Sequence, residues 1–128
     1  MIRKVCCLIF FASLFGSCVD IFEVTDISNE QVQLLAPTNE SIVTDSIVNF
    51  NWNGVKEADA YLVQIATPDF ENASQFILDT LITIDSTFVG NRISKKLLDN
   101  TYQWRVQGQN SMFSTAFSSN TFTVQNAN

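Results

Sequence analysis

Apolar and polar residues alternate with a period of two through most of this chain, and this pattern decides what the chain can fold into. Every second residue is apolar in VNFNW (48–52), YLVQI (61–65), YQWRV (102–106) and TFTV (121–124). Because successive side chains of a strand point to opposite faces, such segments bury one face and expose the other. The sequence therefore predicts half-buried antiparallel strands.

Turn-forming residues separate these segments at the spacing of a β-sandwich. Asn, Asp, Gly and Pro mark breaks at 37–39, 53–54, 68–69, 90–91, 99–100 and 110–111. The expected strands are 31–36, 47–53, 60–67, 75–82, 85–89, 101–109 and 117–125. A short helical turn is expected over 93–98. We predict an all-β fold, a seven-stranded antiparallel β-sandwich that follows an N-terminal signal segment.

The first residues are typical of an export signal. Arg3 and Lys4 precede an uncharged run of eleven residues, 5–15. At ~1.5 Å per helical residue this run reaches only about 16 Å, whereas a spanning helix needs ~20 residues. Gly16 and Ser17 are small, as a peptidase requires just before its cut. Residues 1–17 are therefore interpreted as a cleaved signal peptide.

The segment LFGSC (14–18) resembles the signal of bacterial lipoproteins, in which the cysteine becomes the lipidated first residue. Phe15 departs from the stricter pattern, which prefers a small or aliphatic residue there. Cys6 and Cys7 lie inside the signal, so Cys18 would be the lone cysteine of the mature chain, unable to form an internal disulfide. The resemblance implies lipidation of Cys18 and anchoring to a bacterial outer membrane, facing the surface or the periplasm. The alternative is an ordinary secretory signal with an incidental cysteine.

Residues 18–30 are expected to be the lipidated cysteine and an acidic tether. This segment has no lysine or arginine, and its scattered acids indicate a solvated linker; an export signal toward the outer surface is the alternative. The chain has seven basic residues, two of them in the signal, so the mature chain has five against thirteen acidic ones, a net charge of −8. Such a charge repels phosphate backbones, so no nucleic-acid partner is expected. No cofactor motif is present.

Residues 31–126 resemble a fibronectin type III domain. The positions that carry the resemblance are Trp52 on the second strand, Tyr61 on the third, and Tyr102, Trp104, Val106, Gly108 and Asn110 on the sixth. Lys96 departs from the pattern, because a leucine usually lies six residues before the tyrosine and here Leu97 follows instead. The resemblance implies that Tyr102 bonds backbone near the preceding turn.

Aromatic residues in loops are the candidate ligand contacts. Trp52 and Trp104 lie in phase with the apolar face of their strands, so we assign them to the core rather than to sugar stacking. Phe70 follows the third strand, and Phe113 and Phe117 lie in the last hairpin. Loops at the ends of a sandwich carry recognition. The alternative for all three phenylalanines is packing.

The sequence contains few residue combinations that are typical of catalytic sites. There is no histidine, so the chain has no Ser-His or Cys-His nucleophile pair. The carboxylate pairs Glu57–Asp59 and Asp79–Asp85 lie at turns or strand ends, where solvated charge is the usual role. Zinc spacing and EF-hand loops are absent. The alternative is a calcium site in which Asp69 and Glu71 join carbonyl oxygens around the ion.

The resulting expectation is a lipid-anchored surface interaction or structural module without catalytic activity. Its partners would be the membrane, through the lipid, and a protein or a glycan. The alternative function is a carbohydrate-binding accessory lipoprotein of a polysaccharide-utilisation system. Three Asp-Ser/Thr-containing triplets, 45–47, 79–81 and 85–87, resemble an O-glycosylation signal that would modify Ser46, Thr80 and Ser86. Chance in a Ser/Thr-rich chain is the simpler reading.

Overall fold

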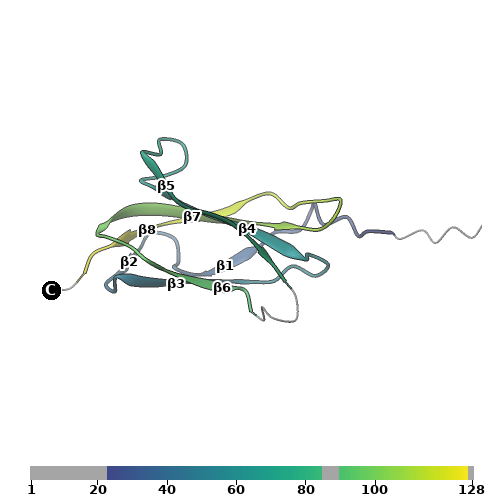
Figure 1. The fold of residues 1–128 in the computed structure, drawn as a ribbon, viewed down its shortest axis with the longest axis horizontal. Coiled ribbons are helices and arrows are strands. Elements are labelled where there is room, and N and C mark those ends of the chain that lie inside the picture. The colour runs from purple at the N-terminus through teal and green to yellow at the C-terminus, as the bar shows by residue number, and fades with distance from the viewer. Residues whose placement is uncertain (1–22, 85–89, 127–128) are drawn as a thin grey trace, which may run out of the picture.

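The computed structural model describes residues 23–84 and 90–126, and in them eight strands form two facing sheets. In chain order the strands are β1 (Gln33–Ala36), β2 (Ser41–Val43), β3 (Ile47–Asn53), β4 (Ala60–Thr67), β5 (Gln75–Thr83), β6 (Arg92–Lys96), β7 (Asn100–Gln109) and β8 (Ser118–Val124). Figure 1 shows the two layers edge-on. No helix long and apolar enough to cross a membrane occurs in the described residues.

One sheet has three strands in the order β1-β3-β6, and the other has five in the order β2-β8-β7-β4-β5. Neighbouring strands are antiparallel except for β2 and β8, which run parallel. The ten-residue strand β7 pairs with β4 on one side and β8 on the other. The all-β sandwich prediction is confirmed, with eight strands described where seven were expected.

The core lies between the sheets and follows from the alternation. Phe50 of β3 faces Trp104 of β7 and Phe122 of β8, with ring centroids 5.0 and 5.6 Å apart in edge-to-face geometry. All three side chains have no exposed surface. Trp52, which is 2% exposed, packs against Tyr61. The assignment of Trp52 and Trp104 to the core is therefore confirmed, and buried aromatic pairs of this kind add about 0.5–1.5 kcal/mol beyond area burial.

The expected helical turn over 93–98 is wrong. Arg92–Lys96 form strand β6, which pairs with β3 so that Ile93 lies opposite Phe50. The backbone of Leu97 then donates to Ser46 O at 2.8 Å. Two adjacent lysines obscure a short alternation here, and the hydrogen-bonding edge of β3 overrides weak local preference. The short strand β2 was not expected either, and the strand expected at 85–89 falls outside the described residues.

The predicted tyrosine, Tyr102 of β7, holds the corner that precedes this strand. Tyr102 is 3% exposed, and its hydroxyl donates to Leu98 O at 2.6 Å. Burial raises the pKa of Tyr102 above its ordinary 10.0, and the negative charge of Asp99 raises it further. The hydroxyl therefore stays protonated and can hold this corner through neutral pH.

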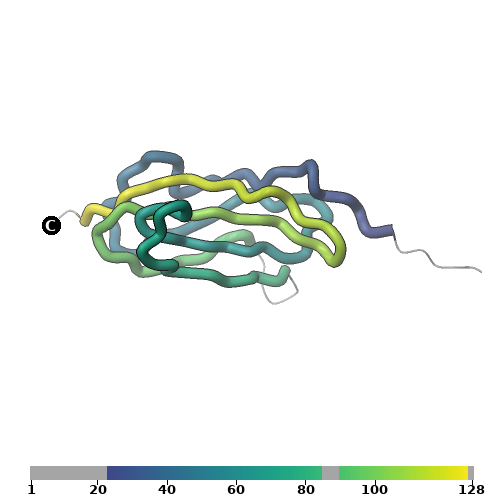
Figure 2. The backbone as a smooth tube through the Cα atoms, turned by 90° about the horizontal axis from the view of Figure 1, so that it is seen from above, coloured from purple at the N-terminus to yellow at the C-terminus, as the bar shows by residue number. Residues whose placement is uncertain are grey.

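The sandwich begins earlier than the sequence predicts. Ile27, expected in the solvated tether, is 1% exposed and belongs to the core cluster. Asn110, beyond β7, donates from Nδ2 to Thr25 O at 2.9 Å. Figure 2 shows this N-terminal segment beside the β7–β8 hairpin, at the end of the molecule opposite the C-terminus. An isolated isoleucine has no period to reveal it, so its burial depends on the surrounding strands.

Candidate functional site

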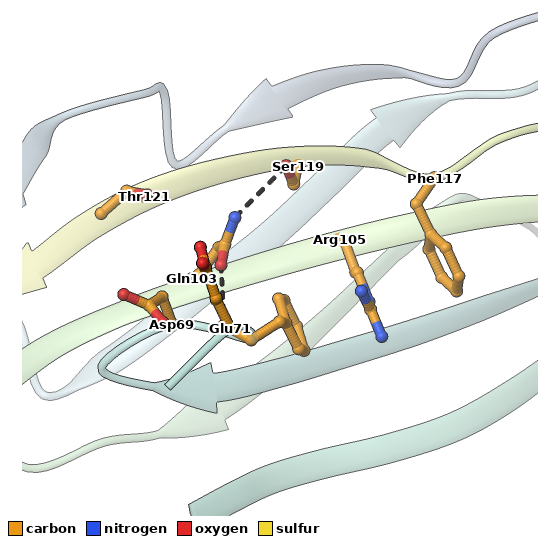
Figure 3. A pocket seen from close by; sticks show the side chains of 8 residues that line it. Asp69, Glu71, Gln103, Arg105, Phe117, Ser119 and Thr121 are labelled. Carbon is orange, nitrogen blue, oxygen red and sulfur yellow. Dashed lines mark hydrogen bonds between the residues drawn. The ribbon is translucent and has the colours of Figure 1, made fainter. Parts of the chain in front are cut away.

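A hollow of about 410 Å³ lies on the outer face of the five-stranded sheet. Alternation that buries Trp104 turns its neighbours Gln103 and Arg105 outward from β7, and register places them opposite Thr121 and Ser119 of β8. The loop between β4 and β5 supplies the remaining wall with Asp69, Phe70 and Glu71, beside Phe117 just before β8. Figure 3 shows these side chains projecting from the two strands and the loop.

The centre of the hollow is an arginine held between two aromatic rings. Arg105 Cζ lies 3.9 Å from the ring centroid of Phe70 and 4.2 Å from that of Phe117. Figure 3 shows Arg105 alongside Phe117. Each cation–π contact is worth about 0.5–1 kcal/mol at an exposed site and more when desolvated. The guanidinium is therefore oriented before any ligand arrives.

A row of hydrogen-bonded polar side chains across β7, β4 and β5 also positions Arg105. Arg105 Nε donates to Gln64 Oε1 at 2.8 Å, and Gln64 Nε2 donates to Asp79 Oδ1 at 3.0 Å. Burial lowers the pKa of Arg105 from its ordinary value, and the charge of Asp79 opposes that change. A guanidinium remains charged at any physiological pH. Because Nε is bonded to Gln64 and two aromatic rings lie against the guanidinium, Arg105 can offer a ligand the N–H groups of its terminal nitrogens.

The wall of the hollow is held by hydrogen bonds from the sheet to the β4–β5 loop. Gln103 Oε1 accepts from Phe70 N at 2.8 Å, and Asp69 Oδ1 accepts from Asn72 N at 2.7 Å. Phe70 also meets Phe76 of β5 edge-to-face, with centroids 5.5 Å apart. Gln103 Nε2 reaches Ser119 Oγ at 3.4 Å, the contact dashed in Figure 3. The loop therefore has a defined position against β7.

Comparison with solved structures identifies the fold. The chain is similar to the crystal structure of FN3tt, with a TM-score of 0.51 and 13% identity over 74% of this chain and 95% of that one. It is equally similar to a computationally redesigned β-sandwich protein, with a TM-score of 0.51 and 14% identity over 77% and 94% of the two chains. The fold is fibronectin type III-like. No protein-family model matches the sequence, and no curated protein matches it.

The fibronectin type III-like fold brings two of the three candidate phenylalanines together and separates the third. Phe70 and Phe117 meet across Arg105. Phe113 is partly buried against the core, and its backbone donates to Asn110 Oδ1 at 2.8 Å within the hairpin loop. Phe113 therefore packs in part against the core and does not line the hollow. Cys18, the predicted lipidation site, lies outside the described residues.

Sequence reasoning missed Arg105 and Gln103. The signal for them was present in YQWRV, because outward positions of a central strand are the ones that line an open sheet face. What the sequence lacked was the identity of the loop that lies over those positions. Sequence patterns do not state that β4 pairs with β7, which sets the β4–β5 loop beside Gln103.

The described residues do not assemble the carboxylate groups that the sequence offered for catalysis or metal binding into a site. Glu57 and Asp59 are both exposed at the β3–β4 turn, and Asp85 of the second carboxylate pair lies outside the described residues. Within the described ranges, no three His, Cys, Asp or Glu side chains gather closely enough to hold a metal ion. Asp69 and Glu71 instead line the hollow around Arg105.

Proposed function

We propose that this protein is a lipid-anchored interaction module that binds its partner through the outer face of the five-stranded sheet. Fibronectin type III-like folds commonly serve as structural or interaction modules. The observation that carries the proposal is the stack of Phe70, Arg105 and Phe117. It places large aromatic groups on a solvent-facing sheet surface, where the core needs none.

The hollow combines room for a ligand with an exposed aromatic ring and with polar groups that are already positioned. Its volume of about 410 Å³ lies within the ~300–1,000 Å³ range of small-molecule sites. Phe117 keeps 36% of its surface exposed although it contacts Arg105. The polar groups are positioned by the hydrogen bonds of the sheet and the loop. A partner would therefore meet an ordered surface and lose little free energy to ordering it.

A photo-crosslinking amino acid at Ser119, on the rim of the hollow, tests the binding face in cells. Gln33, exposed on β1 of the opposite sheet and outside the hollow, is the control position. Adducts of defined mass are expected from Ser119 and not from Gln33. No adduct at Ser119, or the same adducts at both positions, would contradict the proposal that this face binds.

The anchor is the second part of the proposal, supported by the charged start, the uncharged run and the LFGSC segment that ends at Cys18. A thioether-linked lipid plus a second acyl chain is sufficient for stable anchoring. Cys18→Ser should release the protein from membranes and abolish labelling by a fatty-acid probe. A variant that stays membrane-bound and labelled would show that no lipid is attached at Cys18.

A second candidate function is a carbohydrate-binding accessory lipoprotein. The lining of the hollow supports it, because it combines hydroxyl, amide, carboxylate and guanidinium groups with a partly exposed aromatic ring. Binding of soluble polysaccharides by the membrane-extracted protein in affinity electrophoresis is the direct test. If no polysaccharide retards the protein while the crosslinker at Ser119 still yields protein adducts, the carbohydrate-binding function is wrong and the protein-interaction function stands.

A further inference from the structure

The charges around the hollow disfavour ionic ligands of either sign. Asp69 and Glu71 contribute two carboxylates against the single guanidinium of Arg105. An anionic ligand meets a net negative rim on a chain that is itself acidic. A cationic ligand must approach the fixed charge of Arg105 at the centre. An uncharged ligand avoids both penalties.

The hydrogen-bonding groups of the hollow require a ligand that donates and accepts at neighbouring atoms. The terminal nitrogens of Arg105 only donate, and the carboxylates of Asp69 and Glu71 only accept. Ser119 and Thr121 have hydroxyls that do both. Ligand hydroxyl groups match this mixture, since each can donate to a carboxylate while accepting from a guanidinium.

The backbone of β7, which carries Gln103 and Arg105, has no free edge for a peptide strand. The β7 backbone is paired on both sides, with β4 and with β8. On β8, Thr121 N donates to Asn39 Oδ1 at 2.8 Å, and Thr121 O accepts from Glu40 N at 2.5 Å. Recognition of peptides by strand addition needs an unpaired edge. A ligand over β7 therefore meets the side chains of this strand and not its backbone.

Phe117 provides an apolar surface beside these polar groups. The side chain borders the hollow and is 36% exposed, so part of it remains free for a ligand. The faces of aromatic rings carry negative charge density that attracts C–H groups. A sugar ring presents C–H groups on one face and hydroxyls around its edge.

Resting on the proposed binding function, we infer that the hollow takes an uncharged oligosaccharide. A sugar ring stacks on the exposed part of Phe117, and its hydroxyls accept from Arg105 and donate to Glu71 or Asp69. The volume of about 410 Å³ suits a short run of sugar rings rather than one. Glu71 acts as a specificity-determining residue that disfavours acidic sugars.

Isothermal titration with the full chain, extracted in a detergent without a sugar head group, tests this inference. The probes are neutral gluco-, manno-, xylo- and galacto-oligosaccharides of increasing length, with oligogalacturonates and sulfated oligosaccharides as acidic counterparts. At least one neutral series should bind. Phe117→Ala and Arg105→Gln should each weaken that binding about tenfold or more, the range of one lost ligand contact. Met112→Ala is the matched control, because Met112 is 69% exposed in the same hairpin and does not line the hollow.

The role of the negative charge on Glu71 is tested by a single substitution. Glu71→Gln keeps a carbonyl acceptor and removes the charge, so neutral binding should change by less than about threefold while acidic oligosaccharides gain affinity. Tighter binding of acidic than neutral probes by the unaltered protein would overturn the inference, as would neutral binding that Phe117→Ala leaves intact. If no neutral probe binds while a crosslinker at Ser119 still captures a partner, the ligand class is wrong and the binding face stands. Failure of both experiments removes both proposals.

Discussion

Two buried tryptophans offer a matched comparison of one hydrogen bond. Trp104 has no exposed surface, and its Nε1 donates to Pro37 O at 3.2 Å. Trp52 is 2% exposed, and its Nε1 has no hydrogen-bond partner among the described residues. Replacing each by phenylalanine removes the same atoms from the same core. The shared cost of the smaller side chain therefore cancels when the two variants are compared.

The difference between the variants follows from the indole N–H groups. Trp104→Phe loses a hydrogen bond worth about 1 kcal/mol, and Pro37 O is not orphaned because Asn120 Nδ2 also donates to it at 3.3 Å. Trp52→Phe removes a buried unpaired donor, whose desolvation costs about 1–3 kcal/mol. We therefore expect Trp104→Phe to be the more destabilising by about 2–4 kcal/mol.

Urea unfolding of both variants, followed by tryptophan fluorescence of the remaining indole and by circular dichroism, measures this difference. Equal m-values would establish that the unfolding free energies are comparable. In thermal unfolding the gap corresponds to roughly 8 °C or more for a domain of this size. Equal destabilisation, or a larger loss from Trp52→Phe, would refute the reasoning and show that Trp52 Nε1 has a partner such as a buried water.

Three further predictions concern the N-terminal segment, the corner and the stack. Ile27→Ala should cost about 2–4 kcal/mol and increase hydrogen exchange at 23–30, whereas the exposed Leu35→Ala should do neither; unchanged exchange would mean that the segment is not docked. Tyr102→Phe should cost about 1–3 kcal/mol at neutral pH, because Leu98 O loses its donor. The pKa of Tyr102 is higher in the folded than in the unfolded protein, so the stability from its protonated hydroxyl is complete below about pH 10 and is lost as the pH rises through the folded pKa. The urea midpoints of Tyr102→Phe and of the unaltered protein should therefore converge at alkaline pH. A constant gap between the two midpoints would contradict this. Arg105→Gln should lower the unfolding free energy by about 1–2 kcal/mol in urea titrations, the sum of its two cation–π contacts, and no change would show that the stack stores no free energy.

The core was predictable because its signal is local. Phe50, Trp52 and Trp104 each lie in a segment that alternates over several residues, and the structure buries all three. The corner hydroxyl of Tyr102 was expected from the resemblance to fibronectin type III domains, and it bonds the expected stretch of backbone.

The missed elements lack such a signal. Ile93 is the one apolar residue of β6, and Leu97 follows the strand directly. The extended form of β6 therefore depends on its pairing with β3. Ile27 stands alone in an acidic segment and is buried because the sandwich end accommodates it. Neither the pairing of β6 nor the burial of Ile27 can be predicted from a short stretch of sequence.

The candidate site divides in the same way. Phe70 and Phe117 stood out as loop aromatics, but the sequence gives no reason to place them on one arginine. Their meeting requires the pairing order β8-β7-β4, which carries the β4–β5 loop and the start of β8 to the two sides of Arg105.

The sequence by itself therefore determined which residues face inward and which face outward, because side-chain direction along a strand depends only on the period of two. It also determined the all-β class, through the spacing of the turns. Only the tertiary structure decided that Arg105 lies between Phe70 and Phe117, and that Phe113 belongs to the packing. Contacts between distant segments depend on strand order and register, which are set by the free energy of the whole sandwich and not by any one segment.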